Sequence, residues 1–333
     1  MSGVRNRKID LLRGWLIILV VVGHVVVGSI HSQPIRYAIY AFHMPLFIAL
    51  TGYLINANWL RQAPLGDVAK RYWFRVIIPF ALAFGVFTGI LAFHAWQEGR
   101  LSAQWFLGEL ITPYYHLWFI PTLLIWVASF AVLQRCKISM VWILPISLAA
   151  SSLWASGQFD QLPSLIAALL DKKVVYFYAF FVLGVVLRQT GWAGSQWLAR
   201  PWVRFGLAAV VVASFTVYWQ QIGLEPSWTQ SVAWMGLNTT LVLGCLHYVL
   251  AGSADYSTYS SPLIESIGRL SLPIYLWHVL PLFFLKGFDV HETHLGIYYA
   301  VAVVSSILIV WLVLRFEHHS QWLDRWVYGV SRP

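Results

Sequence analysis

Long apolar runs separated by short polar stretches dominate this chain. Each run is about 16 to 21 residues long, close to the roughly 20 residues that an α-helix needs to cross a bilayer. We place the runs at 9–29, 38–56, 74–94, 115–133, 140–155, 174–188, 205–221, 232–250, 271–287 and 296–314. The pattern predicts an all-α, polytopic membrane protein with about ten transmembrane helices.

The positive charges are concentrated in alternate connections between these runs and at the two termini. With ten spans, 17 of the 22 Lys and Arg residues fall on one side, and Arg36, Arg100, Lys172, Lys173 and Lys286 fall on the other. Cytoplasmic loops carry the excess of Lys and Arg, so both termini are expected in the cytoplasm. Membrane orientation explains the net charge of +9 better than a phosphate-binding face does, and no nucleic-acid partner is expected.

Composition agrees with a membrane setting. The chain is 59% hydrophobic and only 11% charged, whereas a soluble domain carries about 25% charged residues. Cys136 and Cys245 do not have metal-ligand spacing, and no metal site is expected. The polar connections are too short to fold alone. We therefore expect residues 1–333 to form a single membrane domain without a soluble domain, and residues 315–333 to be an amphipathic interfacial tail.

The first apolar run carries three ionisable residues, Asp10, Arg13 and His24. At about 100° per residue they fall within about 60° of one another around a helix, with His24 about 16 Å beyond Arg13. Ionisable groups inside a membrane are expensive and usually functional. Taken alone, Asp10 and Arg13 have the alternative of forming a salt bridge with each other. The alternative for His24 is a purely structural role. Together the three suit a ligand with an anionic end at the surface and a reactive end inside.

Polar residues in other runs extend this set. Arg71 and Arg75 are four apart before the third run, where they fit either ordinary cytoplasmic charge or a guanidinium clamp for phosphates. Gly52 in the second run would permit close helix contact. The remaining candidates are His43 and Tyr53 in the second run, His116 and Trp118 in the fourth, and Tyr275 and His278 in the ninth. Each of these alone also fits an interfacial or helix-packing role.

Together these motifs resemble those of acyltransferase family 3, the integral membrane O-acyltransferases that include fucose 4-O-acetylase-like enzymes. The resemblance is carried by Lys8 to Gly14 with His24, by Phe42 to Phe47 with Thr51, Gly52 and Tyr53, by Arg71 and Arg75 before Pro79, by His116 to Phe119, and by Tyr275 with His278. Thr51 stands where the family usually has Ser, and it keeps the hydroxyl. The arginine pair is separated by three residues, whereas the family often has two.

The resemblance implies a reaction and its partners. An acetyl or other short acyl group would pass from cytoplasmic acyl-CoA, with acetyl-CoA as donor substrate and no permanently bound cofactor. The acceptor would be a sugar hydroxyl on a lipid-linked or cell-surface glycan. The protein would lie in the bacterial cytoplasmic (inner) membrane. Besides these two substrates, the expected partners are membrane lipids.

The resemblance also implies roles for the candidate residues. The donor would be bound by Arg13, Arg71 and Arg75. Catalysis would involve His24, Asp10 and His278. The acceptor would be bound by His43, Tyr53, His116, Trp118 and Tyr275. His24 would be the general base, with a covalent acyl-His24 intermediate as the alternative. Asp10 is about 21 Å from His24 along the helix, so its expected role is to hold Arg13. His278, like His43, would orient the acceptor or stabilise the oxyanion.

A transporter or flippase for a glycolipid or small anion is the alternative function, because buried His and Arg also suit a proton-coupled carrier. The sequence shows no internal repeat of the kind found in many transporters. A membrane scaffold without chemistry would leave the Asp10–Arg13–His24 face unexplained. We therefore favour the acyltransferase.

Overall fold

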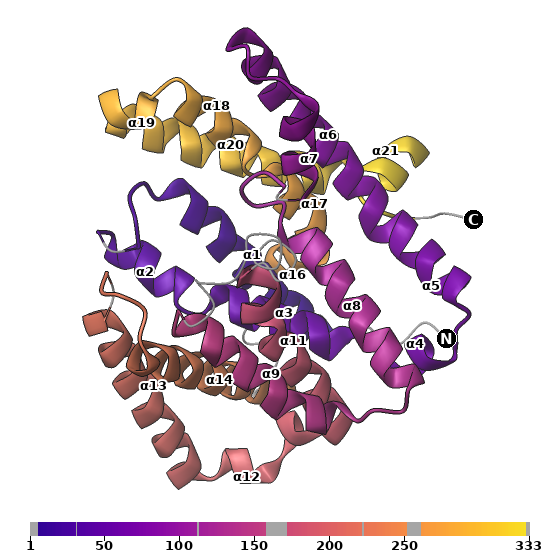
Figure 1. Cartoon of the computed structure of the whole chain (residues 1–333), viewed down its shortest axis with the longest axis vertical. Coiled ribbons are helices and arrows are strands. Elements are labelled where there is room, and N and C mark those ends of the chain that lie inside the picture. Colours follow the sequence, from indigo (N-terminus) through magenta and orange to yellow (C-terminus); the bar gives the residue numbers. More distant parts are fainter. Residues whose placement is uncertain are drawn as a thin grey trace. The chain divides into compact units, whose positions relative to one another are not determined.

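Apolar stretches form helices along the whole chain (Figure 1). The computed structural model describes residues 6–30, 32–111, 113–157, 172–221, 223–251 and 261–330. Within these ranges every regular element is helical, which confirms the predicted all-α class. Two compact units result: Met1–Val27, Ala63–Leu124 and Ser261–Pro333 form the first, and Gly28–Gln62 and Ile125–Ser260 form the second.

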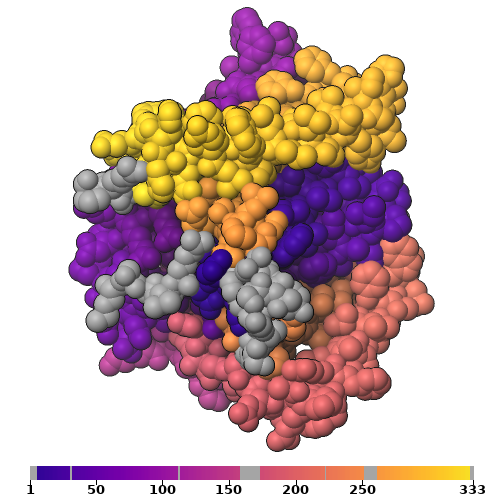
Figure 2. All heavy atoms as spheres, turned by 180° about the vertical axis from the view of Figure 1, so that it is seen from behind, coloured from indigo at the N-terminus to yellow at the C-terminus, as the bar shows by residue number. Residues whose placement is uncertain are grey.

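The first unit combines both ends of the chain with a segment near its start. Its helices are α1 (Arg7–Val25), α5 (Leu65–Tyr72), α6 (Ile78–Gln97), α7 (Ala103–Ile111), α16 (Pro262–Arg269), α17 (Ser271–Trp277), α18 (Leu280–Gly287), α19 (Val290–Thr293), α20 (Leu295–Phe316) and α21 (Gln321–Trp326). A π-helical turn, η1 (Trp73–Ile77), joins α5 to α6. In Figure 2 the yellow surface of α20 borders the orange surface of α16 and α17, and α20 also contacts α1.

The second unit consists mainly of packed apolar helices. They are α2 (Pro34–Tyr40), α3 (His43–Leu54), α4 (Ala57–Gln62), α9 (Met140–Ala155), α11 (Lys172–Thr190), the 3₁₀ turn η2 (Trp192–Gly194), α12 (Gln196–Ala199), α13 (Pro201–Gln221) and α14 (Trp228–Ala251), while α8 (Phe119–Arg135) begins in the first unit and continues here. A Cβ on Gly52 would overlap the carbonyl of Phe181, and one on Gly184 would overlap that of Ala49. The close helix contact predicted at Gly52 is therefore confirmed, between α3 and α11.

Among the described residues, six helical stretches are long and apolar enough to cross a membrane. They are Pro34–Leu54, Leu65–Gln97, Lys173–Thr190, Pro201–Gln221, Trp228–Leu250 and Leu295–Phe316. The pair Pro262–Arg269 and Ser271–Gly287, bent by 69°, is a seventh if it counts as one span. Helices α8 and α9 are apolar but shorter, and α1 carries Lys8, Asp10 and Arg13 within its 19 residues. A helix lies at each of the ten predicted positions, and the count of ten spans stays a prediction.

Several polar connections contain helices of their own, among them the connections before the fourth and the ninth apolar runs. Helix α7 lies in the connection 95–114, and α16 lies in 251–270, of which residues 252–260 fall outside the described residues. Helix α16 has a well-formed start, because the Ser261 side chain accepts a hydrogen bond from the Ile264 N–H and Pro262 occupies the first turn. This short helix carries the site described below.

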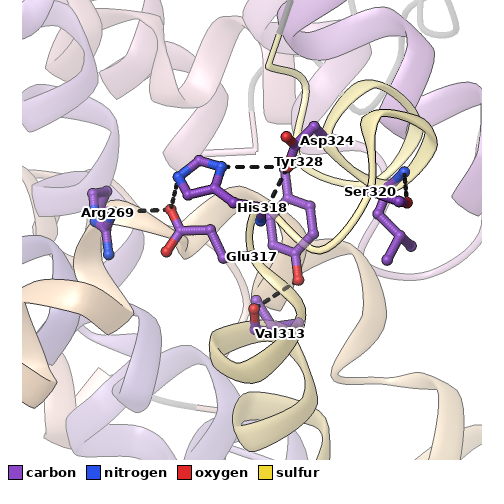
Figure 3. Close-up of polar contacts among 8 residues, drawn as sticks. Arg269, Val313, Glu317, His318, Ser320, Asp324 and Tyr328 are labelled. Atoms are coloured by element: carbon purple, nitrogen blue, oxygen red, sulfur yellow. Dashed lines mark hydrogen bonds and ion pairs between the residues drawn. The ribbon is translucent and has the colours of Figure 1, made fainter. Parts of the chain in front are cut away.

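The end of the chain folds back onto the first unit (Figure 3). The Arg269 guanidinium lies 2.8 Å from the Glu317 carboxylate, and His318 lies 3.5 Å from Glu317 and 3.4 Å from Asp324. The backbone N–H of His318 donates to the same Asp324 carboxylate at 3.1 Å. These alternating charges connect α16, the end of α20 and α21.

Tyr328 and Gly329 complete this tail. Burial, with the nearby carboxylates of Glu317 and Asp324, raises the pKa of Tyr328 to about 12, so its hydroxyl stays neutral and donates to the Val313 carbonyl at 2.7 Å. A Cβ on Gly329 would overlap the carbonyl of Arg75, which places the tail directly against η1. The exposed rings of Trp322 and Trp326 stack on each other, as suits the expected interfacial segment.

The ten-span arrangement predicts the side on which each connection lies. Reporter fusions at Arg135 and Arg200 should give a cytoplasmic signal, and fusions at Gln97 and Lys172 a signal from the opposite side, because this arrangement puts 17 of the 22 positive residues in the cytoplasm. Paired phosphatase and fluorescent-protein fusions measure this directly. A cytoplasmic signal at Lys172 would contradict the arrangement and mean that α9 and α11 do not both cross.

Candidate active site

Helix α1 rests on α16 with their backbones in direct contact. A Cβ on Gly14 would overlap the Ile264 carbonyl, and a Cβ on Gly268 would overlap the Asp10 carbonyl. Only glycine at both positions lets the two helices approach this closely, as small residues do at helix interfaces within membranes. The position of α1 is thereby fixed on a helix from the other end of the chain.

Two polar contacts set the register of this packing. Arg7 binds the buried Glu265 carboxylate through both oxygens, with Nε–Oε2 at 2.8 Å and Nη2–Oε1 at 3.2 Å. Nη2 of Arg13 donates to the Ser271 hydroxyl at 2.7 Å. Both contacts join residues that are 258 apart in sequence. Helix α1 therefore runs alongside α16 and α17 in the same direction.

This register brings His24 to the end of α17, where three histidines gather. The ring centroids of His24 and His278 are 5.1 Å apart, those of His116 and His278 are 5.4 Å apart, and those of His24 and His116 are 6.5 Å apart. We call these three residues the histidine cluster. His116 and His278 are buried and His24 is half-buried. Arg13 and His24 thus face the same segment, as expected from their positions on one face of the first helix.

A tyrosine that precedes α8 contacts the histidine cluster. The Tyr115 hydroxyl lies 3.1 Å from Nδ1 of His24, and the Lys286 ammonium lies 5.7 Å from the centre of the Tyr115 ring. Tyr115 has a backbone φ of 42°. A non-glycine residue held in this left-handed region costs about 1–3 kcal/mol, and such strain is commonly found at functional sites. The connection before α8 therefore holds the hydroxyl beside His24 at the expense of local strain.

Tyr275 supports the cluster from within the protein. Its hydroxyl donates to the backbone carbonyl of His116, and its ring lies 5.5 Å from the His116 ring and 5.7 Å from that of Phe119. Phe87 on α6 meets His116 edge-on at 5.2 Å. These contacts fix the position of His116, so Tyr275, which the sequence suggested for acceptor binding, has its hydroxyl engaged inside the protein.

Three arginines, one each from α1, α5 and η1, lie near one another. Arg75 lies in the π-helical turn η1, a rare conformation often found at functional sites, and its side chain is exposed. The charges of Arg71 and Arg75 repel each other, and the charge of Arg75 also acts on Arg13. Asp10 attracts Arg13, and its role in holding Arg13 stays a prediction. Three guanidinium groups held near one another form a site of strong positive potential.

Of the remaining predicted residues, two lie in the second unit, and the third, Trp118, lies two residues beyond His116. His43 and Tyr53 are both on α3 in the second unit. Nδ1 of the buried His43 is 2.7 Å from the Ile39 carbonyl, and the Arg188 guanidinium lies 3.4 Å from the Tyr53 hydroxyl. Trp118 is half-buried, with its ring near that of Phe119. A role in acceptor binding stays a prediction for these three.

Sequence reasoning missed Glu265, Ser271 and the contact of Tyr115 with His24. The signals were weak: Ser271 begins the ninth apolar run, and Tyr115 read as one of several interfacial aromatic residues. In the described ranges, no group of three His, Cys, Asp or Glu side chains is placed to hold a metal ion.

Comparison with known proteins identifies the family. Residues 6–315 match the acyltransferase family 3 model, which is described as an acyltransferase domain. The chain is 33% identical to the nodulation protein NolL of Sinorhizobium fredii over 208 residues, which is 57% of this chain and 51% of that protein. It is 27% identical to NolL of Mesorhizobium japonicum over 223 residues, which is 61% of this chain and 54% of that protein.

The chain spans about half the length of these curated relatives. No solved structure matches it. The family match nevertheless covers nearly all of the helices described above, from the start of α1 to within one residue of the end of α20. The chain therefore belongs to acyltransferase family 3.

Proposed function

We propose that this protein is a membrane O-acyltransferase that moves an acetyl or other short acyl group from cytoplasmic acyl-CoA to a sugar hydroxyl of a lipid-linked or cell-surface glycan. The proposed setting is the bacterial inner membrane, with both termini in the cytoplasm. One observation carries the proposal: α1 holds Arg13 at one end and His24 at the other, both against the same α16–α17 segment.

The arginine end suits the coenzyme. Phosphates are bound strongly by guanidinium groups, which offer two parallel N–H donors. Arg13, Arg71 and Arg75 are close enough for their charges to interact, and in the ten-span arrangement all three are at the cytoplasmic side. The pantetheine arm would then extend along α1, and about 16 Å of helix separates Arg13 from His24.

The histidine end suits the chemistry. The acceptor hydroxyl gives its proton to His24 as its oxygen attacks the thioester carbonyl carbon. The new carbon–oxygen bond forms, the carbon–sulfur bond breaks, and the coenzyme thiolate leaves and takes a proton back from the imidazolium. The Tyr115 hydroxyl at 3.1 Å orients the His24 ring. An acyl-His24 intermediate is the alternative route, and it would give ping-pong kinetics.

Replacing Arg75 tests the donor site. We expect Arg75→Ala to weaken acetyl-CoA binding about ten- to hundredfold, because it removes a charge-assisted hydrogen bond of about 1.5–3 kcal/mol. Arg75→Lys should restore part of the affinity, since an ammonium lacks the planar fork of donors. Calorimetry on the purified protein in detergent measures both values.

Arg61→Ala is the matched control, because Arg61 is an exposed arginine on the same expected side but lies on α4 in the second unit. It should bind acetyl-CoA with unchanged affinity. Equal affinities for Arg75→Ala, Arg61→Ala and the unchanged protein would exclude Arg75 from the donor site.

Replacing His24 tests the catalytic step. His24→Ala should fold and bind acetyl-CoA, yet its rate of transfer should fall about 10² to 10⁴-fold, the usual contribution of a general base. The measurement is kcat for transfer from radiolabelled acetyl-CoA to membrane glycans, together with the melting temperature. A loss of kcat at constant donor affinity distinguishes a base from a binding residue.

His247→Ala provides the comparison, because His247 is a buried histidine that contacts the Ala193 carbonyl in the second unit. It should transfer acetyl groups normally per folded molecule. Normal turnover by well-folded His24→Ala would remove His24 from the mechanism.

A further inference from the structure

The segment that follows α20, residues 317–330, is closed on itself around one buried side chain. We call it the tail segment. The carboxylate of Asp324, which is 1% exposed, accepts a hydrogen bond from the His318 backbone N–H at 3.1 Å and lies 3.4 Å from the His318 ring (Figure 3). The Asp324 backbone carbonyl accepts another from the Val330 N–H at 2.7 Å. Asp324 therefore holds the two ends of the tail segment together.

The tail segment contacts two successive residues of η1. Gly329 has a φ of 65°, in the left-handed region that glycine adopts freely, and a Cβ on it would overlap the carbonyl of Arg75. The Arg325 guanidinium lies 5.0 Å from the centre of the Phe74 ring, within the range of a cation–π contact. The backbone that carries Arg75 is therefore packed directly against the tail segment.

Its other end is attached to α16. The Arg269 guanidinium lies 2.8 Å from the Glu317 carboxylate. Arg269 directly follows Gly268, whose backbone touches that of α1. The tail segment thus connects the helix on which α1 and Arg13 rest with the turn that carries Arg75.

The three neighbouring arginines need such support. The charge of Arg75 repels those of Arg71 and Arg13, so these groups do not hold one another in place. A π-helical turn is also a rare conformation, found mostly as a single turn within longer helices. A constant spacing of the guanidinium groups therefore depends on contacts made to η1 from other segments, and the tail segment makes contacts of this kind.

We propose that the tail segment is a positioning element of the donor site, in which Gly329 and Arg325 hold Arg75 at the spacing from Arg13 that the phosphates of acyl-CoA require. The inference rests on the proposed function and adds residues from outside the motifs that suggested the site. The tail segment also lies beyond residues 6–315, which match the family. Because it acts through η1 and not on the reacting atoms, changes in it should alter donor affinity and leave kcat at saturating donor unchanged.

Hydrogen exchange tests the support of η1 without any donor. Gly329→Ala puts a methyl group where the Arg75 carbonyl lies, so the amides of residues 73–78 should exchange about ten times faster, as overpacking of the usual size would cause. Gly99→Ala is the matched control, because Gly99 has a φ of 66° and a Cβ there would meet nothing within 4 Å. It should leave these amides unchanged. Mass spectrometry of the purified protein in detergent measures both, and equal exchange in the two variants would overturn the proposal.

Donor affinity tests the consequence. Gly329→Ala should weaken acetyl-CoA binding roughly tenfold, the effect of losing a well-placed charged hydrogen bond, and Gly99→Ala should bind normally. In an Arg75→Ala background, Gly329→Ala should cause no further loss, because the tail segment acts through Arg75. Unchanged affinity of Gly329→Ala, or losses that simply add in the double variant, would overturn the proposal.

Arg325 provides a second variant that leaves the backbone of the tail segment intact. Arg325→Ala removes the contact with Phe74 and should weaken acetyl-CoA binding about two- to fivefold, and Arg325→Lys should restore most of the affinity because it keeps the cation. Arg315→Ala removes the same charge from an exposed arginine near the end of α20 and should bind normally. Equal losses in Arg315→Ala and Arg325→Ala would mean that net charge sets the affinity, and would contradict the proposal.

These measurements separate a failure of the tail segment from a failure of the donor site. If Arg75→Ala itself binds acetyl-CoA normally, the donor site and this proposal fail together. If Arg75→Ala weakens binding and Gly329→Ala does not, the donor site stands and only the positioning role is wrong. The result that we expect is a loss in both variants, with faster exchange in η1 for Gly329→Ala and kcat unchanged.

Discussion

The contact between α1 and α16 determines the rest of the site. Gly14 and Gly268 allow the two backbones to touch, and the Arg7–Glu265 pair fixes their register. A larger residue at either glycine would separate the helices, and overpacking of this kind typically costs about 1–3 kcal/mol. Because α16 continues through a bend into α17, the position of α1 also fixes the distance between Arg13, Ser271 and the histidines beyond them.

That single arrangement explains how a charged helix can sit in a membrane protein. Asp10, Arg13 and His24 are costly in an apolar setting, yet each faces a partner on the first unit. The polar side of α1 is covered by a short helix, and Arg7 at its start is paired with Glu265. In the function that we propose, the same covering would give an acyl-CoA donor a phosphate-binding end and a reactive end.

Sequence alone predicted the helical class, the close contact at Gly52 and the common face of Arg13 and His24, because these depend on local spacing. It could not predict that His116 and His278 meet His24, because the three come from segments far apart in the chain. Helix α16 was read as part of a connection, since it has only eight residues and carries Glu265 and Arg269. The Ser261–Pro262 start was the signal that could have revealed it. The contacts of His116 and His278 with backbone carbonyls depend on the packing of distant segments, which no sequence pattern specifies.

The central claim is that the donor lies along α1, from the arginines to the histidine cluster. The most direct test is a cryo-electron microscopy structure with S-acetonyl-CoA, a thioether analogue that cannot transfer its acyl group. The account predicts that the coenzyme phosphates contact Arg13 and Arg75 and that the ketone lies beside His24, within the few ångströms that a reacting group requires. Phosphates bound away from these arginines, or a ketone bound away from His24, would contradict it.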